Sequence, residues 1–124
     1  AFTYFKKNGG GHLAVISSIA GTKGLGVAPA YSATKRFQNT YIDALEQLSY
    51  LQKLHIRFTD IRPGFVDTAM AKGEGLFWVT PVDKAVKQIK KAISKKKKVA
   101  FISKRWRYVT ILFRLLPSAI YCRM

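Results

Sequence analysis

The stretch Tyr31-Ser-Ala-Thr-Lys35 places a tyrosine and a lysine four residues apart. On a helix this spacing puts both side chains on one face. A phenol is seldom ionised at neutral pH, and a neighbouring ammonium favours the phenolate. The pattern therefore suits a general acid/base made from tyrosine. Two such residues at this spacing also occur as ordinary side chains lying along a helix surface.

Two apolar stretches flank this pattern. His12-Leu-Ala-Val-Ile-Ser-Ser18 predicts a buried strand that ends in two hydroxyls. Ile56-Arg-Phe-Thr-Asp-Ile-Arg-Pro63-Gly64 predicts a second strand that ends in a Pro-Gly turn. A helix over residues 30–51 separates them, and a third strand is expected over residues 99–102. Strands that alternate with helices in this way predict an α/β fold with a parallel sheet.

Three motifs occur in one order along the chain: Val15-Ile-Ser-Ser-Ile-Ala-Gly21, Tyr31-Ser-Ala-Thr-Lys35 and Arg62-Pro-Gly-Phe-Val-Asp-Thr68. In that order and spacing they resemble the C-terminal half of a short-chain dehydrogenase/reductase, from residue 1 to about residue 103. The resemblance implies half of a doubly wound, parallel-sheet, Rossmann-like fold. It also implies that the glycine-rich phosphate turn lies in an N-terminal half that is absent here. We therefore expect this chain alone to be inactive and the full chain to be an enzyme.

The resemblance also implies roles for individual residues. Tyr31 would exchange a proton while a hydride moves between a nicotinamide and a carbonyl or alcohol carbon. Lys35 would favour the phenolate and bond the nicotinamide ribose. Ser18 would orient the substrate oxygen, with Ser17 as the alternative one position away. The cofactor would be NADP or NAD, no metal is expected, and the cofactor-binding residues would be Tyr31, Lys35, Pro63, Gly64, Val66 and Thr68.

The long helix carries an apolar pattern of its own. Phe37, Tyr41, Leu45 and Leu48 follow three- and four-residue steps, which predicts one apolar stripe. Tyr41 and Tyr50 are expected in the packing. In the family this helix commonly packs on its equivalent in a second subunit, so the resemblance implies a homo-oligomer.

The loops contain candidate ligand-binding residues with simpler alternatives. Gly21, Gly24 and Gly26 do not form a dinucleotide fingerprint, since the next helix opens only after Pro29, and a substrate-side loop is favoured. A second set either walls an apolar substrate pocket or packs in the core: Met70, Leu76, Phe77 and Trp78.

Three other polar residues are expected in structural roles. His12 is favoured as a structural residue, and Asp60 is expected to make a structural hydrogen bond or to pair with Arg57 or Arg62. Thr80 is predicted to cap a helix. The residues of that helix expected to face inward are Val82, Ala85, Val86, Ile89, Ala92 and Ile93.

Composition favours a folded chain with an anionic partner. Apolar residues make up 48% of the sequence, and the formal net charge is +16. From Pro81 onward there are thirteen Lys or Arg against one acid, Asp83. Such a bias is typical of proteins that bind a membrane, a nucleic acid or a phosphorylated ligand. The single Cys122 excludes an intramolecular disulfide and fits a cytoplasmic location.

Residues 104–124 are predicted to form a basic amphipathic tail, separate from the domain formed by residues 1–103. Its expected apolar face consists of Trp106, Val109, Leu112, Phe113 and Leu116. In one alternative, residues 95–124 bind the inner surface of an anionic membrane through this face. In the other, the face docks on the sheet or on a partner subunit. An inactive fragment that binds membrane or nucleic acid is the alternative function. Nucleic acid is disfavoured because no recognised motif accompanies the charge.

Overall fold

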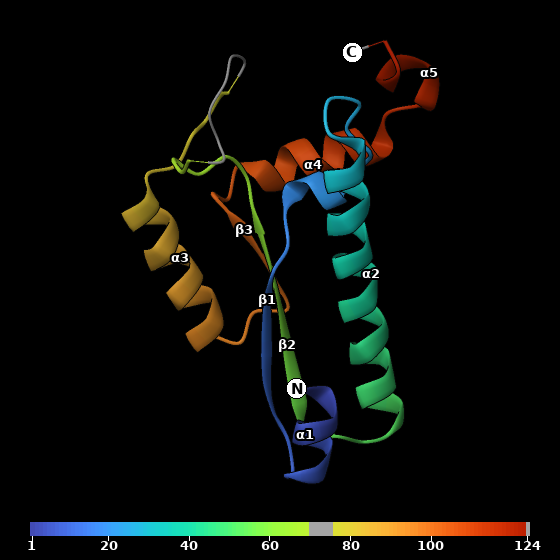
Figure 1. The fold of residues 1–124 in the computed structure, drawn as a ribbon, viewed down its shortest axis with the longest axis vertical. Helices are drawn as coiled ribbons and strands as arrows, with labels where there is room; N and C mark the ends of the chain where they lie inside the picture. Colours follow the sequence, from blue (N-terminus) through green and yellow to red (C-terminus); the bar gives the residue numbers. More distant parts are fainter. Residues whose placement is uncertain (70–75, 124) are drawn as a thin grey trace.

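The computed structural model describes residues 1–69 and 76–123 and has an α/β architecture (Figure 1). Met70, one of the expected pocket residues, lies outside the described residues. The elements in chain order are α1 (Phe2–Lys7), β1 (Gly11–Ile16), the 3₁₀ turn η1 (Ile19–Gly21), α2 (Pro29–Leu51), β2 (Ile56–Pro63), α3 (Val82–Ser94), β3 (Val99–Ile102), α4 (Trp106–Leu115) and α5 (Ser118–Tyr121).

The three strands form one parallel sheet in the order β1-β2-β3. Gly11 lies opposite Ile56 and Ile16 opposite Ile61, while Asp60 of β2 lies opposite Val99 of β3. Parallel neighbours need a crossover connection, and α2 and α3 supply the two crossovers on opposite faces of the sheet (Figure 1). The predicted fold class is confirmed. β1 ends two residues earlier than expected, so Ser17 and Ser18 follow the strand.

A separate apolar cluster lies on each face of the sheet. Ile42 of α2 packs with Ile56 and Phe58 of β2, and the aromatic rings of α1 close the edge of this cluster. On the other face, Ile61 and Ile102 pack with Ala85 of α3. These two clusters hold the crossover helices against the sheet, as expected of a layered α/β domain.

The packing predicted for Tyr41 and Tyr50 of α2 is wrong, because both side chains are exposed. The buried residues of α2 are Ser32, Asn39, Ile42 and Ser49, and Leu45 packs against the core. Phe37, Tyr41, Leu48 and Tyr50 are exposed, and the rings of Phe37 and Tyr41 stack with centroids 5.7 Å apart. Small and polar residues therefore form the inner face of α2, and its largest apolar residues point outward.

Helix α3 also differs from the prediction at its first turn. Thr80 is buried, and its backbone joins an isolated parallel bridge with Val66. Its side chain makes no capping hydrogen bond to the helix. Ala85 and Ala92 are buried, and Ile89 and Ile93 pack on the core as expected. Val82 and Val86 are exposed, because the inward face of the helix is narrower than the sequence pattern indicates.

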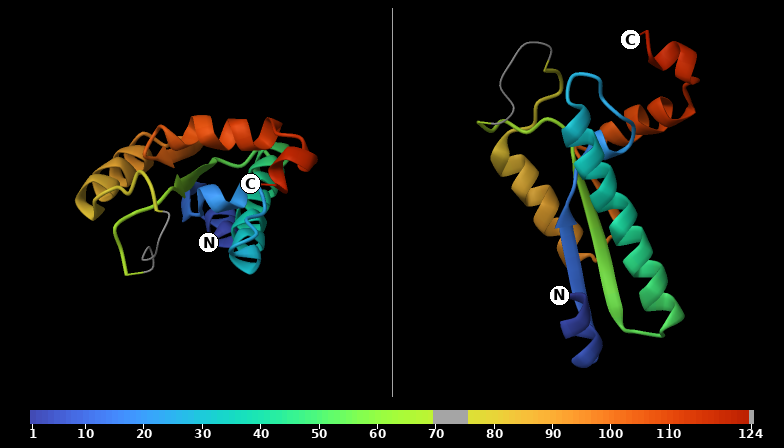
Figure 2. Two further views of the ribbon diagram at one scale, coloured as in Figure 1. Left: turned by 90° about the horizontal axis from the view of Figure 1, so that it is seen from above. Right: turned by 45° about the vertical axis from the view of Figure 1, so that its right-hand side comes forward.

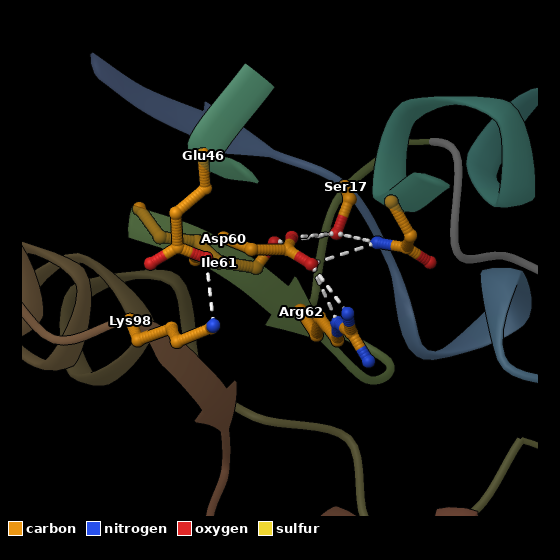
Figure 3. Close-up of polar contacts among 7 residues, drawn as sticks. Ser17, Glu46, Asp60, Ile61, Arg62 and Lys98 are labelled. Atoms are coloured by element: carbon orange, nitrogen blue, oxygen red, sulfur yellow. Dashed lines mark hydrogen bonds and ion pairs between the residues drawn. The ribbon is translucent and has the colours of Figure 1, made fainter. Parts of the chain in front are cut away.

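One ion pair joins the turn before β3 to α2. The Lys98 ammonium lies 2.7 Å from Glu46 Oε2 (Figure 3). The hydrogen bond with Glu46 raises the pKa of Lys98 above its ordinary value, and the partial burial of the ammonium acts in the opposite direction. Because the lysine side chain is largely exposed, the pair stabilises the fold by less than about 1 kcal/mol.

Helix α4 crosses the carboxyl ends of the strands, from the α3 side of the sheet to the first turn of α2 (Figures 1 and 2). Trp106 is its anchor and is only 2% exposed. The indole packs on Gly64 and lies edge-on or tilted to the rings of Phe65, Phe77 and Trp78, at centroid distances of 5.1–5.6 Å.

Of the two alternatives for the apolar face of the tail, docking on the fold describes Trp106. Leu112, from the same predicted face, is exposed. The division of the chain at residue 103 stays a prediction. In the described ranges 1–69 and 76–123, every helix is too short or too polar to cross a bilayer.

Replacing Gly64 by alanine tests this docking contact. A Cβ at Gly64 would overlap the Trp106 indole, which is rigid and enclosed by aromatic rings. We expect Gly64→Ala to lower the free energy of unfolding by about 1–3 kcal/mol and to shift tryptophan fluorescence to the red. Urea unfolding followed by fluorescence measures both effects. Gly24→Ala is the matched control, because a Cβ at Gly24 meets open space. Equal stability of the two variants would contradict the contact.

Candidate active site

The candidate residues converge on the carboxyl edge of the sheet. β1 ends there and leads into Ser17, Ser18 and η1, α2 begins there, and the turn after β2 runs along it (Figure 1). Ligands of open α/β sheets bind outside the carboxyl ends of the strands. The fold therefore places all three sequence motifs at the edge where such sheets bind ligands.

Tyr31 and Lys35 lie on one face of the first two turns of α2, as their spacing predicts. Pro29 occupies the first helical turn, where its missing N–H is not needed. The Lys35 ammonium is 5.7 Å from the centroid of the Tyr31 ring and donates to the carbonyl oxygen of Ile16 at 3.3 Å. Tyr31 is 41% exposed. A solvent-accessible phenol thus lies beside an ammonium that the end of β1 holds in place.

The two serines after β1 have different surroundings. Ser17 Oγ lies 2.5 Å from Asp60 Oδ1 and accepts a hydrogen bond from the Asn39 amide at 2.9 Å. Ser18 Oγ accepts from the Ala20 N–H at 3.1 Å, and its other neighbour is the Pro63 carbonyl at 3.5 Å. Ser17 is thus held within the protein interior. Ser18 is also buried, but its hydroxyl donates only to the Pro63 carbonyl at 3.5 Å, so it is the freer of the two to donate to a substrate oxygen.

A buried polar network lies beneath this edge (Figure 3). The Asp60 carboxylate is 1% exposed and accepts hydrogen bonds from Ser17, from Asn39 at 2.9 Å and from Arg62 at 2.7 Å. The prediction that Asp60 pairs with an arginine is confirmed, and the partner is Arg62. A buried carboxylate requires such partners, because removing it from water is costly. The network fixes β1, α2 and β2 relative to one another directly below the candidate residues.

Asn39 is the residue of this site that the sequence analysis did not identify. Asn39 follows Lys35 by four residues and Tyr31 by eight. A third polar residue at this spacing, near the same helix face, is the sequence pattern that could have identified it. Gly21 is required opposite it, because a Cβ at Gly21 would overlap the Asn39 side chain and approach the Lys35 carbonyl. The close approach of η1 to α2 therefore depends on this glycine.

The segment after β2 forms an ordered turn along the same edge. The Gly64 N–H donates to the Ile102 carbonyl at 2.6 Å, Val66 bridges to Thr80, and the Thr68 hydroxyl donates to the Val66 carbonyl at 3.3 Å. These are the residues that the resemblance assigns to cofactor binding. The backbone of the segment is tied to β3 and to the start of α3.

The expected apolar pocket residues pack against the tail. Phe77 and Trp78 belong with Phe65 to the aromatic cluster around Trp106, and both remain partly exposed. The two alternatives for these residues are core packing and a wall of an apolar pocket. One side of each ring packs in the aromatic cluster, and the other side stays accessible.

A small hollow lies between the loop of residues 21–26 and the start of α2. A cavity of about 380 Å³ is bounded by the loop of residues 21–26 and by the first turns of α2, including Pro29, Ser32 and Arg36. The Leu25 N–H donates to Ser32 Oγ at 3.0 Å, which holds the loop against the helix. Tyr31 and Lys35 do not line this hollow, and their helical positions put them on the other side of α2.

His12 has a structural partner, as expected. Its Nε2 lies 2.8 Å from Thr59 Oγ1, within the sheet. In the described part of the chain, the side chains of His, Cys, Asp and Glu form no group of three or more that could hold a metal ion.

A family model and several known proteins are similar to this chain. The family model of the short chain dehydrogenases matches residues 1–76. A zebrafish (Danio rerio) protein, Dehydrogenase/reductase SDR family member 7B, is 31% identical over 130 residues, covering 94% of this chain and 41% of the zebrafish protein. An uncharacterized oxidoreductase of Myxococcus xanthus is 42% identical over 60 residues, which is 48% of this chain and 23% of that protein.

A solved structure shares the fold. The crystal structure of a short chain dehydrogenase from Burkholderia cenocepacia J2315 in complex with NADP matches 98% of this chain and 49% of its own, with a TM-score of 0.78. At 18% identity this similarity shows the Rossmann-like fold alone. The chain spans less than half the length of the curated relatives described above.

The buried network is tested by removing its centre. Asp60→Ala leaves Arg62, Asn39 and Ser17 without their shared acceptor, so we expect the free energy of unfolding to fall by about 3–5 kcal/mol. Chemical denaturation followed by circular dichroism measures the loss. Asp43→Ala, an exposed carboxylate on α2, is the control and should change stability by less than about 0.5 kcal/mol. A loss of similar size in both variants would show that Asp60 does not organise the edge.

Proposed function

The chain belongs to the short-chain dehydrogenase family, and on that premise we propose that the whole protein is an NAD(P)-dependent oxidoreductase. The proposed reaction transfers a hydride between a nicotinamide and a carbonyl or alcohol carbon. The observation that carries the proposal is the pairing of Tyr31 with Lys35 at the carboxyl edge of the sheet.

In this proposal the chain's residues move a proton and hold the reacting oxygen. The Tyr31 hydroxyl donates its proton to the forming alkoxide in reduction and accepts it in oxidation. The Lys35 ammonium stabilises the negative charge left on the phenol oxygen. The Ser18 hydroxyl donates a hydrogen bond to the same substrate oxygen, so the developing charge meets two donors.

The cofactor proposed is NADP or NAD, and the chain's residues fit its nicotinamide end. Lys35 has an ammonium held at the edge, and the turn containing Pro63, Gly64, Val66 and Thr68 lies along it with a tied backbone. Bound there, the nicotinamide supplies the hydride chemistry, and the protein supplies placement. The solved NADP complex of a fold relative supports this assignment.

The substrate class proposed is an apolar carbonyl compound or alcohol. Phe77 and Trp78 each keep an accessible side near the turn after β2. The loop of residues 21–26 lies against the start of α2, the helix that carries Tyr31 and Lys35. Aromatic and small apolar surfaces with few polar groups are typical of sites for apolar ligands.

We also propose a homo-oligomer formed through α2. Phe37, Tyr41 and Leu48 are exposed on one side of the helix, where a soluble monomer gains nothing from large apolar residues. Packing on the same helix of a second subunit would bury these side chains, in agreement with the behaviour of the family.

The location proposed is cytoplasmic, with a peripheral position on an anionic membrane through residues 95–124. The observation that favours it is the strongly basic C-terminal third, in which the run of residues 95–98 is exposed. An inactive chain that serves only as a membrane-binding module is the second candidate function. Nucleic-acid binding remains disfavoured, since charge alone would support it.

The tyrosine is tested by Tyr31→Phe in the full-length protein. Removing the hydroxyl removes the proton donor, and we expect kcat/KM to fall by a factor of about 10² to 10⁴. NADPH-dependent reduction of a panel of apolar ketones and aldehydes measures the effect. Tyr41→Phe, which removes an exposed hydroxyl almost three turns further along α2, is the control and should keep its turnover. Turnover near that of the unmodified protein in Tyr31→Phe would refute the assignment.

The oligomer is tested by polar substitution on the outer side of α2. We expect Phe37→Gln with Tyr41→Gln to shift the protein to a lower mass in sedimentation velocity, since the two stacked rings would be central to the interface. The control pair is Tyr50→Gln with Leu51→Gln, at the far end of the helix. An unchanged mass in the first variant, with the unmodified protein oligomeric, would place the interface elsewhere.

A further inference from the structure

Helix α4 has a second apolar face, on the side opposite Trp106. Tyr108, Ile111, Leu112 and Leu115 follow positions i, i+3, i+4 and i+7, so they form one continuous row. Their exposed fractions are 74%, 46%, 56% and 75%. The inward face of the same helix is occupied by Trp106 and Thr110, both buried. We call the exposed row the outer stripe.

The outer stripe is flanked by positive charge alone. Residues 104–123 contain five basic residues and no aspartate or glutamate. Arg107 and Arg114 are exposed one position from members of the stripe, and Lys104 and Arg105 precede the helix. An apolar row bordered by cations is the pattern of a helix that lies in the interface of an anionic bilayer.

The tail is fastened to the glycine loop, residues 21–26, which leads into α2. The Lys23 ammonium donates to the carbonyl oxygens of Phe113 and Leu116 at 3.0 and 2.8 Å, at the C-terminal end of α4. It also lies 4.2 Å from the centroid of the Tyr121 ring. The Tyr121 hydroxyl donates to the Gly24 carbonyl at 2.6 Å. These contacts fix α4 and α5 to the loop that lies between Ser18 and Tyr31.

From these observations we propose that the outer stripe docks on an anionic lipid bilayer, with α4 parallel to the membrane plane. The apolar row enters the interface, and the flanking arginines contact lipid phosphates and carboxylates. Because Lys23 and Tyr121 tie the tail to the glycine loop, docking sets the carboxyl edge of the sheet next to the lipid. This consequence rests on the proposed function: an apolar substrate dissolved in the bilayer would reach Tyr31 from the membrane side.

A bilayer fits the outer stripe better than a second copy of the chain. Two copies facing through this helix would bring their arginines together, with no carboxylate in the tail to neutralise them. The stripe consists of four side chains, which is little for a stable protein interface. A nucleic acid would use the charges and leave the apolar row exposed.

Vesicle binding tests the docking face without any cofactor or turnover. The protein is sedimented with vesicles of neutral phosphatidylcholine and with vesicles that contain phosphatidylserine, at low and high salt. We expect binding to the acidic vesicles only, weakening as salt is raised. Leu112→Gln with Leu115→Gln should lower the partition constant about tenfold or more, since both side chains leave the lipid. Glutamine is a good helix former, so α4 should persist, and circular dichroism checks this.

Two further variants separate the contributions. Tyr50→Gln with Leu51→Gln removes an equal number of exposed apolar residues from the far end of α2 and should leave binding unchanged. Arg107→Gln with Arg114→Gln should weaken binding to acidic vesicles and flatten its salt dependence.

Two results would overturn the proposal. Acidic-vesicle binding that is lost in the arginine variant and kept in the leucine variant would indicate simple electrostatic adsorption. A change of mass in lipid-free sedimentation velocity for the leucine variant would assign the stripe to self-association. Neither result depends on Tyr31, so failure of the docking face and failure of the proposed reaction are distinguishable.

Discussion

The carboxylate of Asp60 is the interaction on which the rest of the candidate site depends. It lies within the central strand and receives hydrogen bonds from the end of β1, from α2 and from Arg62 of its own strand. A buried charge can persist only with such donors, so the three elements must meet at this point. Tyr31, Lys35 and Ser18 lie on those same elements. Their arrangement at the sheet edge follows from a group that would itself touch no substrate.

A second contact that fixes the carboxyl edge of the sheet is the packing of Trp106 on Gly64. This contact joins the C-terminal tail to the turn that follows the central strand, and the bonds of Lys23 and Tyr121 join the same tail to the glycine loop. The tail therefore contacts both the turn after β2 and the loop that precedes α2. This arrangement links a basic surface helix to the chemistry proposed for the domain.

Small residues are used where elements approach closely, and large apolar residues remain on the surface. Gly21 admits the Asn39 side chain, and serines form much of the inner face of α2. The outer side of that helix and the outer stripe of α4 are consequently apolar and exposed. Exposed apolar rows of this size are typical of surfaces that meet another molecule. In the proposals made above, the exposed side of α2 would meet a second subunit and the outer stripe of α4 would meet lipid.

The sequence by itself determined the order of the strands and helices, the parallel sheet, and the helical face shared by Tyr31 and Lys35. These features depend on local periodicity and on spacing along one element, which a sequence carries directly. It did not determine which side of α2 or α4 is buried, because both helices carry apolar residues on more than one side. Nor did it identify Asn39, or choose Arg62 over Arg57 as the partner of Asp60. Only the tertiary structure decided these points, since each depends on which buried donor or acceptor lies across from the residue in space.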